Sequence, residues 1–284
     1  MFQNLWSSKS ISRLQQSLRR LADLGPIKVW MRLGYAAKGF IYLIIGLFAL
    51  GRALERRMPL LGTEGILQVV TRQPLGLFFL YLLASGLAGY AFWRFVQALS
   101  DPEHSGKQSL LRTVQRLGYA ISGFSYAGVV YASIELIANV SSEQDDTLED
   151  FAAQLVETGW GVLLLVLAGL TVVGVGFVYI YGGLSGAYIS QFKRECDRNL
   201  SRVATWLGQI GYTARGVAFV VIGIGQLQAA FLSRSDPAGG LQNALEKLEA
   251  QPYGKVSLGL IAAGFIAYAL YAIFVSFYRR FRLQ

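Results

Sequence analysis

Long runs without a single charged residue restrict the fold of this chain more than any other feature. Five such runs cover residues 75–93, 117–134, 158–192, 216–232 and 256–278. A sixth apolar stretch, 33–53, is interrupted only by Lys38 and Arg52. About 20 apolar residues are enough for a helix to cross the hydrocarbon core of a bilayer. The sequence therefore predicts an all-α integral membrane protein with six transmembrane helices.

Composition agrees with a membrane location and excludes several kinds of site. Of 284 residues, 54% are hydrophobic and 15% are charged, far from the balance of a soluble domain. Cys196 is the single cysteine and His104 the single histidine, so no internal disulfide, cysteine-based metal cluster or bis-histidine haem can form within the chain. We therefore expect no metal and no cofactor.

The basic residues predict the orientation of the spans. The N-terminal residues up to Arg32, the loops 94–116 and 193–202, and the C-terminal tail hold 17 Lys and Arg, whereas the other three loops hold seven. Positive charge marks the cytoplasmic side, so both termini are expected to face the cytoplasm. The net charge of +9 then reflects topology and not binding to nucleic acid.

The N-terminal segment, residues 1–28, is expected to lie at the cytoplasmic surface of the membrane. One helical face would carry the apolar residues, and the rest of the wheel would carry Lys9, Arg13, Arg19 and Arg20. This pattern is typical of a basic amphipathic helix in the interface. It would serve as a plain anchor or, alternatively, recruit a partner or sense anionic lipid.

One eleven-residue pattern occurs three times along the chain. The copies are RLGYAAKGFIY at 32–42, RLGYAISGFSY at 116–126 and QIGYTARGVAF at 209–219. Fixed self-similarity of this kind predicts a repeat architecture. The copies delimit three two-helix repeats within one compact membrane domain, at residues 29–103, 112–190 and 203–280.

The second span of each repeat is also related, although the middle copy has drifted furthest. Tyr90 pairs with Tyr268, but Val173 stands at this position in the second repeat. Short amphipathic helices are expected between the spans of repeats 1 and 3, at 64–70 and 241–248. Because a two-span unit begins and ends on the same side, successive repeats are parallel and predict a pseudo-threefold bundle.

The repeated pattern places glycine and aromatic residues along one face of each helix. In lipid, glycine on such a stripe marks the close approach of a neighbouring helix. We therefore predict a helix-packing role for the stripe; the alternative is that it lines a path for a ligand or ion. Its members are Gly34, Tyr35, Gly39, Tyr42 and Gly46; Gly118, Tyr119, Gly123 and Tyr126; and Gly211, Tyr212, Gly216, Phe219 and Gly223.

With three Arg-x-Gly-Tyr-x-x-x-Gly copies at regular intervals, the chain resembles a bacterial multi-pass membrane family catalogued as domain of unknown function number 1206. The resemblance covers 32–277 and implies the six-span repeat architecture, but it brings no activity. The chain departs from the pattern by having Gln209 at the arginine position of the third copy.

Ionisable residues within membrane spans are candidates for function. Lys38, Arg94 and Arg215 are expected near the cytoplasmic level, with Ser122 at the equivalent position of repeat 2. They would form a basic ring for an anionic lipid or solute, or, in the preferred interpretation, snorkel to lipid phosphates. Glu135, near the outer interface, is expected to be a solvated helix-end residue, the alternative being a proton-relay acid.

No catalytic signature accompanies these charges: the sequence has no phosphate-binding loop, zinc-protease motif or Cys-x-x-Cys pair. We therefore expect a non-catalytic structural or interaction module that contacts anionic membrane lipids at the cytoplasmic face and a membrane-protein partner. The alternatives are a small channel or transporter along the pseudo-threefold axis and, third, an enzyme acting on lipid headgroups.

Overall fold

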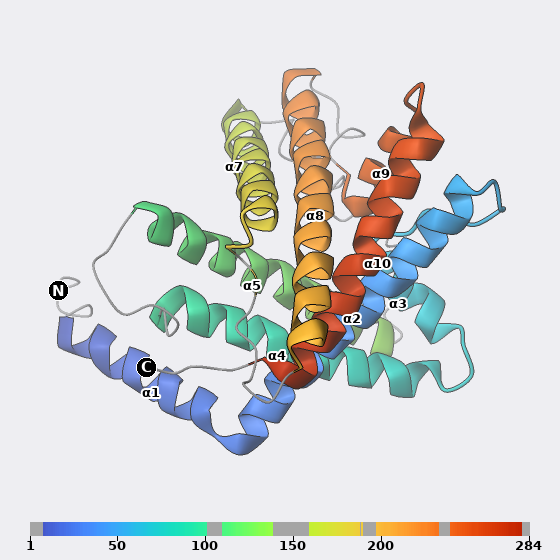
Figure 1. Cartoon of the computed structure of the whole chain (residues 1–284). Coiled ribbons are helices and arrows are strands. Elements are labelled where there is room, and N and C mark those ends of the chain that lie inside the picture. Colours follow the sequence, from blue (N-terminus) through green and yellow to red (C-terminus); the bar gives the residue numbers. More distant parts are fainter. Residues whose placement is uncertain are drawn as a thin grey trace.

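The computed structural model describes residues 8–100, 110–138, 159–187, 189, 197–232 and 239–279, and these form an all-helical bundle (Figure 1). Six of its helices are long and apolar enough to cross a membrane, and this confirms the predicted number of spans. They are α2 (Gly25–Ala53), α4 (Gly76–Ser100), α5 (Leu110–Ile137), α7 (Gly159–Leu184), α8 (Arg198–Leu232) and α10 (Gly254–Tyr278). His104 and Cys196 lie outside the described residues.

The predicted N-terminal helix is present as α1 (Ser8–Asp23) and packs against α4 and α2. Gln15 Nε2 donates a hydrogen bond of 2.8 Å to the carbonyl of Leu99, and the Arg19 guanidinium donates to the carbonyl of Ser100. These acceptors lie in the last turn of α4, whose carbonyls have no partner within the helix. The helix α1 is therefore docked on the bundle, and we call this end of the bundle the α1 end.

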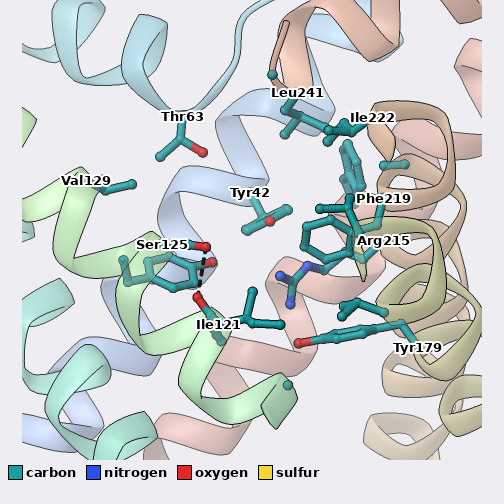
Figure 2. A pocket seen from close by; sticks show the side chains of 18 of the residues that line it. Tyr42, Thr63, Ile121, Ser125, Val129, Tyr179, Arg215, Phe219, Ile222 and Leu241 are labelled. Atoms are coloured by element: carbon teal, nitrogen blue, oxygen red, sulfur yellow. Dashed lines mark hydrogen bonds between the residues drawn. The ribbon is translucent and has the colours of Figure 1, made fainter. Parts of the chain in front are cut away.

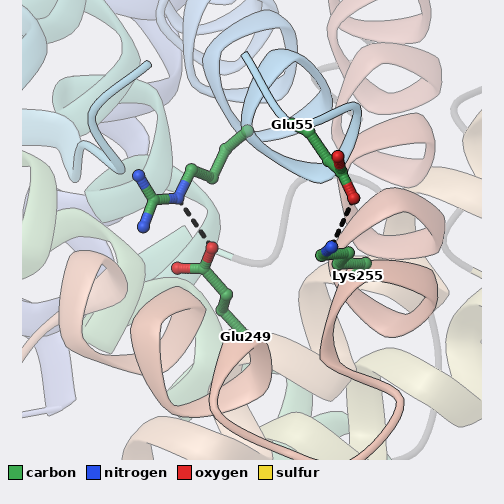
Figure 3. A network of polar contacts seen from close by, with 4 residues as sticks. Glu55, Glu249 and Lys255 are labelled. Atoms are coloured by element: carbon green, nitrogen blue, oxygen red, sulfur yellow. Dashed lines mark hydrogen bonds and ion pairs between the residues drawn. The ribbon is translucent and has the colours of Figure 1, made fainter. Parts of the chain in front are cut away.

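The opposite end carries the two short helices expected between the spans of repeats 1 and 3, α3 (Thr63–Thr71) and α9 (Leu241–Glu249). Figure 3 shows two ion pairs that join repeat 1 to repeat 3 here. Arg52 Nε lies 2.6 Å from Glu249 Oε1, and Lys255 pairs with Glu55. We call this end the α3–α9 end.

The Glu55–Lys255 pair makes a small, pH-dependent contribution to stability. The hydrogen bond and charge of Lys255 lower the pKa of the Glu55 carboxyl. The contribution is therefore present above the ordinary carboxyl pKa and is lost as the pH falls through the lowered value. It stays small because both side chains are exposed and screened by solvent.

Helix packing follows the cyclic order expected for three parallel repeats but leaves the ring open at one place. The contacts run from α5 to α4, α2, α10, α8 and α7, so all three junctions between repeats are formed. The two spans pack on each other in repeats 1 and 3. Among the described helices, α5 and α7 are the two ring neighbours without such packing. Repeat 2 is therefore split, with α5 docked on repeat 1 and α7 on repeat 3.

In the first two copies, the arginine that opens the repeated pattern caps a helix of the adjacent repeat in the ring. Arg32 donates to the carbonyls of Ser276, Phe277 and Arg279 at distances of 3.1, 2.5 and 3.2 Å, at the C-terminus of α10. Arg116 does the same at the end of α4, donating to Ala98 at 2.7 Å and Leu99 at 3.2 Å. A cation at a helix C-terminus satisfies free carbonyls and interacts favourably with the helix dipole.

Replacing Arg32 with alanine is expected to lower the free energy of unfolding by about 1.5–3 kcal/mol, because charged hydrogen bonds to half-buried carbonyls are lost. Reversible unfolding in mixed dodecyl sulfate and maltoside micelles measures this change. The exposed Arg57 makes no such contact, so Arg57→Ala is the matched control. Equal stability of the two variants would contradict a capping role for Arg32.

Glycines of the repeated stripe lie where helices cross closely. A Cβ atom on Gly34 would come within 2.5 Å of the Tyr90 nitrogen of α4, and one on Gly211 within 2.5 Å of the Tyr268 Cα of α10. Gly39, Gly46, Gly216 and Gly223 similarly face the backbone of a neighbouring helix. The second copy differs, since Gly123 contacts the ring of Phe95 and Gly118 has no atom within 4 Å of an added Cβ. For Gly118 the packing prediction is wrong, because α7 does not pack on α5 among the described helices.

This difference gives opposite expectations for one substitution at two equivalent positions. Gly34→Ala is expected to cost about 1–3 kcal/mol, because backbone atoms of α4 must move to make room. Gly118→Ala is expected to be neutral or to stabilise by up to about 1 kcal/mol, since alanine favours the helix and meets nothing. Unfolding titrations of both variants test this, and a similar loss at both positions would contradict the split in repeat 2.

Candidate functional site: a buried cation and tyrosine centre

Three cations of the spans lie inside the bundle and not at its surface. The exposed fractions are 0% for Lys38, 4% for Arg94 and 3% for Arg215. The interpretation that these residues snorkel to lipid phosphates is therefore wrong. The interpretation fails because of helix length. Both α2 and α8 begin well before the apolar runs, so Lys38 and Arg215 lie near the middle of their helices and face other helices.

Lys38 and Arg94 meet at one tyrosine. The hydroxyl of Tyr90 accepts hydrogen bonds from Lys38 Nζ at 2.6 Å and from Arg94 Nε at 2.7 Å. Arg94 Nη1 also donates to Gln97 Oε1 at 2.9 Å, and Gln97 is itself buried. The Lys38 ammonium further lies 4.2, 4.8 and 5.1 Å from the ring centres of Tyr90, Tyr126 and Tyr268. Aromatic faces attract cations, and this attraction is strongest away from water.

Arg215 occupies the third corner of the same cluster. Its guanidinium carbon lies 4.6 Å from the ring centre of Tyr268, 4.9 Å from that of Tyr42 and 5.2 Å from that of Tyr179. Lys38 and Arg215 therefore share Tyr268, as Lys38 and Arg94 share Tyr90. In contrast to the other two cations, Arg215 has buried nitrogens, Nε and Nη1, that find no hydrogen-bond partner among the described residues.

We call Lys38, Arg94, Arg215 and the tyrosines that they contact the cation–tyrosine centre. Within the described part of the chain, none of the three cations forms an ion pair with a carboxylate. Buried charges in proteins are normally paired, and a buried unpaired guanidinium nitrogen costs free energy. Tyrosine rings and hydroxyls offset part of this cost but supply no negative charge. The centre is therefore chemically suited to an anion.

A cavity of about 290 Å³ opens beside Arg215 (Figure 2). We call it the repeat-2 cavity, because α5 and α7 contribute Ser122, Tyr126, Val129, Val172, Val175 and Tyr179 to its wall. Its wall also includes Tyr42, Phe265, four residues of α8 (Arg215, Phe219, Ile222 and Gln226) and, at the α3–α9 end, Thr63 and Leu241. Its volume lies near the lower end of pockets that hold small organic ligands.

Ser122 is the repeat-2 counterpart of Lys38 and Arg215 and lines this cavity. Its side chain is 8% exposed, and its hydroxyl oxygen has no hydrogen-bond partner. Two polar groups on facing helices, Arg215 and Ser122, therefore border one space with unused hydrogen-bonding capacity. Glu135 is not part of the cavity wall: it is half-buried in the last turn of α5, at the α3–α9 end.

The stripe tyrosines line the centre as well as the helix crossings. Tyr35, Tyr42, Tyr126 and Tyr212 are all buried, and Phe219 lies 5.5 Å from the guanidinium of Arg215. Tyr119 lies 5.0 Å from the guanidinium of Arg94. Packing and lining of a site are thus compatible functions of one stripe, because glycine sets the helix spacing and tyrosine faces the interior.

Several members of the site were not identified from the sequence. Tyr90 and Tyr268 were recognised as a repeated pair but not as partners of cations. Gln97 follows Arg94 by one helical turn and offered no pattern of its own. Arg279 was assigned to the polar tail, yet it is buried and donates to the Tyr35 hydroxyl at the α1 end.

Comparisons with other proteins agree with the repeats. Residues 33–101, 117–186 and 210–279 each match the family described as Domain of Unknown Function (DUF1206). A protein of Bacillus subtilis (strain 168) described as "Uncharacterized protein YxxB" is 26% identical over 260 residues, which cover 89% of this chain and 91% of the relative. No solved structure matches significantly.

Proposed function

The chain belongs to the Domain of Unknown Function (DUF1206) family, and we propose that this member is a non-catalytic membrane protein that binds an anionic ligand at its cation–tyrosine centre. One observation carries the proposal: Arg215 and Ser122 border a cavity with buried polar atoms that lack partners. An anion beside Arg215 would supply the missing charge and accept hydrogen bonds from both residues.

Two further features support a binding function over the alternatives. Tyrosine rings and three cations fill the interior where the repeats meet, which favours holding a ligand over conduction along the axis. Catalysis by Ser122 would require a base bonded to its hydroxyl, and the hydroxyl has no such partner. Among the described residues, no group of three His, Cys, Asp or Glu could hold a metal ion.

The expected setting is the bacterial plasma membrane, with both termini in the cytoplasm. The excess of Lys and Arg in the segments at the α1 end supports this orientation. Docking of α1 on α4 would then place a basic helix at the cytoplasmic surface, where it can contact anionic lipids and a membrane-protein partner.

Ligand-dependent stability tests the proposal. The purified protein in maltoside micelles would be heated with orthophosphate, laurate or dodecyl phosphate, with uncharged 1-dodecanol as the matched control. A ligand at 100 times its Kd stabilises the folded state by about 2.7 kcal/mol. We expect stabilisation by at least one anion and none by dodecanol. Equal effects of the anions and dodecanol, or no effect of any anion, would contradict anion binding.

A further inference from the structure

The repeat-2 cavity changes from polar to apolar along the helices that form it. Arg215 and Ser122 border it near the middle of α8 and α5. About two turns further toward the α3–α9 end, its wall includes Ile222 on α8 and Val129 on α5, and polar side chains return only beyond them, at Gln226 and Thr63. On α7, which runs in the opposite direction, Val175 and Val172 face this apolar part. The cavity thus combines one cationic end with a chamber suited to hydrocarbon.

The apolar part lies where the ring of helices is open. The most apolar stretches of α5 and α7 are 28% and 22% buried, compared with 56% for both α2 and α4 and 61% for α10. Gly118 and Gly128 on α5 and Gly174 on α7 have no atom within 4 Å of an added Cβ. No described helix fills this gap between α5 and α7, so in a bilayer it faces acyl chains, because both helices that border it are long and apolar enough to span the membrane.

We propose that the ligand is a single-chain anionic amphiphile, which enters from the bilayer between α5 and α7 and places its acid group beside Arg215. This inference rests on the proposed function. A volume of about 290 Å³ accommodates an acid group and the first part of one chain, while the remaining chain extends through the gap. A transmembrane helix of a partner protein would cover the gap but would leave the Arg215 nitrogens unpaired.

A binding comparison separates this inference from anion binding in general. The probes are orthophosphate, which has no chain, and laurate and dodecyl phosphate, which share a chain but differ in the acid group. Each is titrated against the protein in nanodiscs of uncharged lipid. We expect at least one amphiphile to bind 10-fold or more tightly than orthophosphate. Which amphiphile binds more tightly distinguishes a carboxylate from a phosphate headgroup.

Two tryptophan variants of α7 test where the chain lies. Val175→Trp fills the apolar part of the cavity, whereas Phe177 is 60% exposed on the outside of the same helix, so Phe177→Trp is the matched control. We expect Val175→Trp to weaken amphiphile binding at least 10-fold with little effect on orthophosphate, and Phe177→Trp to change neither.

Each other outcome has a definite meaning. If orthophosphate and both amphiphiles bind with equal affinity, and Val175→Trp does not change it, the amphiphile proposal is wrong but the proposed anion site is retained. If Val175→Trp lowers the affinity for all probes equally, the substitution acts at the acid-binding end of the cavity, and the proposed position of the acyl chain is wrong. Absence of binding by every probe overturns both proposals. Displacement of the amphiphiles by a copurifying membrane protein would assign the gap to a helix of that protein and overturn the lipid route.

Covalent labelling locates the chain directly. A dodecyl phosphate with a diazirine at the end of its chain is activated by light in the nanodisc, and labelled peptides are identified by mass spectrometry. We expect labels concentrated on α5 and α7 that Arg215→Gln removes. Uniform labelling of all lipid-facing helices would overturn the inference.

Discussion

Replacing Arg215 with glutamine is expected to weaken binding of the anionic probes by at least about 30-fold. Removing one partner of a buried, hydrogen-bonded charge pair costs about 2–5 kcal/mol, which corresponds to this factor or more. Arg215 lines the cavity and has two buried nitrogens without a partner, so it is the group expected to contact the acid. Titration of laurate and dodecyl phosphate into nanodiscs that contain each protein measures the change.

Arg215→Lys provides the matched control for charge. Lysine keeps the positive charge but lacks the planar arrangement of donors that fits an acid group, so an intermediate affinity is expected. Unfolding without a probe shows whether each variant is folded. If folded Arg215→Gln bound the probes as tightly as the unsubstituted protein, the acid-binding role of Arg215 would be wrong.

Replacing Lys38 with methionine is expected to stabilise the protein without ligand while weakening its response to anions. Lys38 is fully buried, shares tyrosines with two other cations and has no carboxylate partner among the described residues. Exchange of buried charges for apolar side chains of similar volume often stabilises a protein by about 1–4 kcal/mol. The Tyr90 hydroxyl still accepts a hydrogen bond from Arg94 in this variant.

The change is measured as the difference in free energy of unfolding with and without dodecyl phosphate. Lys28 pairs with Asp23 at the surface, so Lys28→Met removes a charge outside the centre and is the matched control. We expect the control to alter stability by less than about 1 kcal/mol. A strong loss of stability in Lys38→Met without ligand would show that the lysine is structural and not held for a ligand.

The sequence predicted the architecture well because lipid leaves few choices for an apolar run. Six apolar stretches, five of them uncharged, correspond to the six spans. Three copies of one glycine pattern correspond to the three repeats, and the short outer segments correspond to α3 and α9. The arginine of the pattern was predicted to recur but not to act as a cap. Its acceptors belong to a different repeat, at sequence separations of 244 to 247 residues for Arg32 and of 17 and 18 for Arg116, and only the packed bundle brings them together.

The location of the candidate site depended on where helices begin, and the sequence shows this poorly. Lys38 was placed one turn from the membrane surface because the apolar run begins at Leu33, whereas α2 begins at Gly25. Those additional turns move Lys38 toward the middle of the helix. At Ser122 and Val173 the sequence of repeat 2 departs from the repeated pattern, which indicates that this repeat differs from the others. The helices against which α5 and α7 pack are determined by contacts with other repeats, and these contacts cannot be predicted from the local sequence.

An experimental structure with dodecyl phosphate bound tests the central claim most directly. We predict phosphate oxygens within hydrogen-bonding distance of the Arg215 guanidinium and the Ser122 hydroxyl, with the acyl chain leaving between α5 and α7. Pairing of Arg215 with a carboxylate of its own chain, with no probe in the repeat-2 cavity, would contradict it.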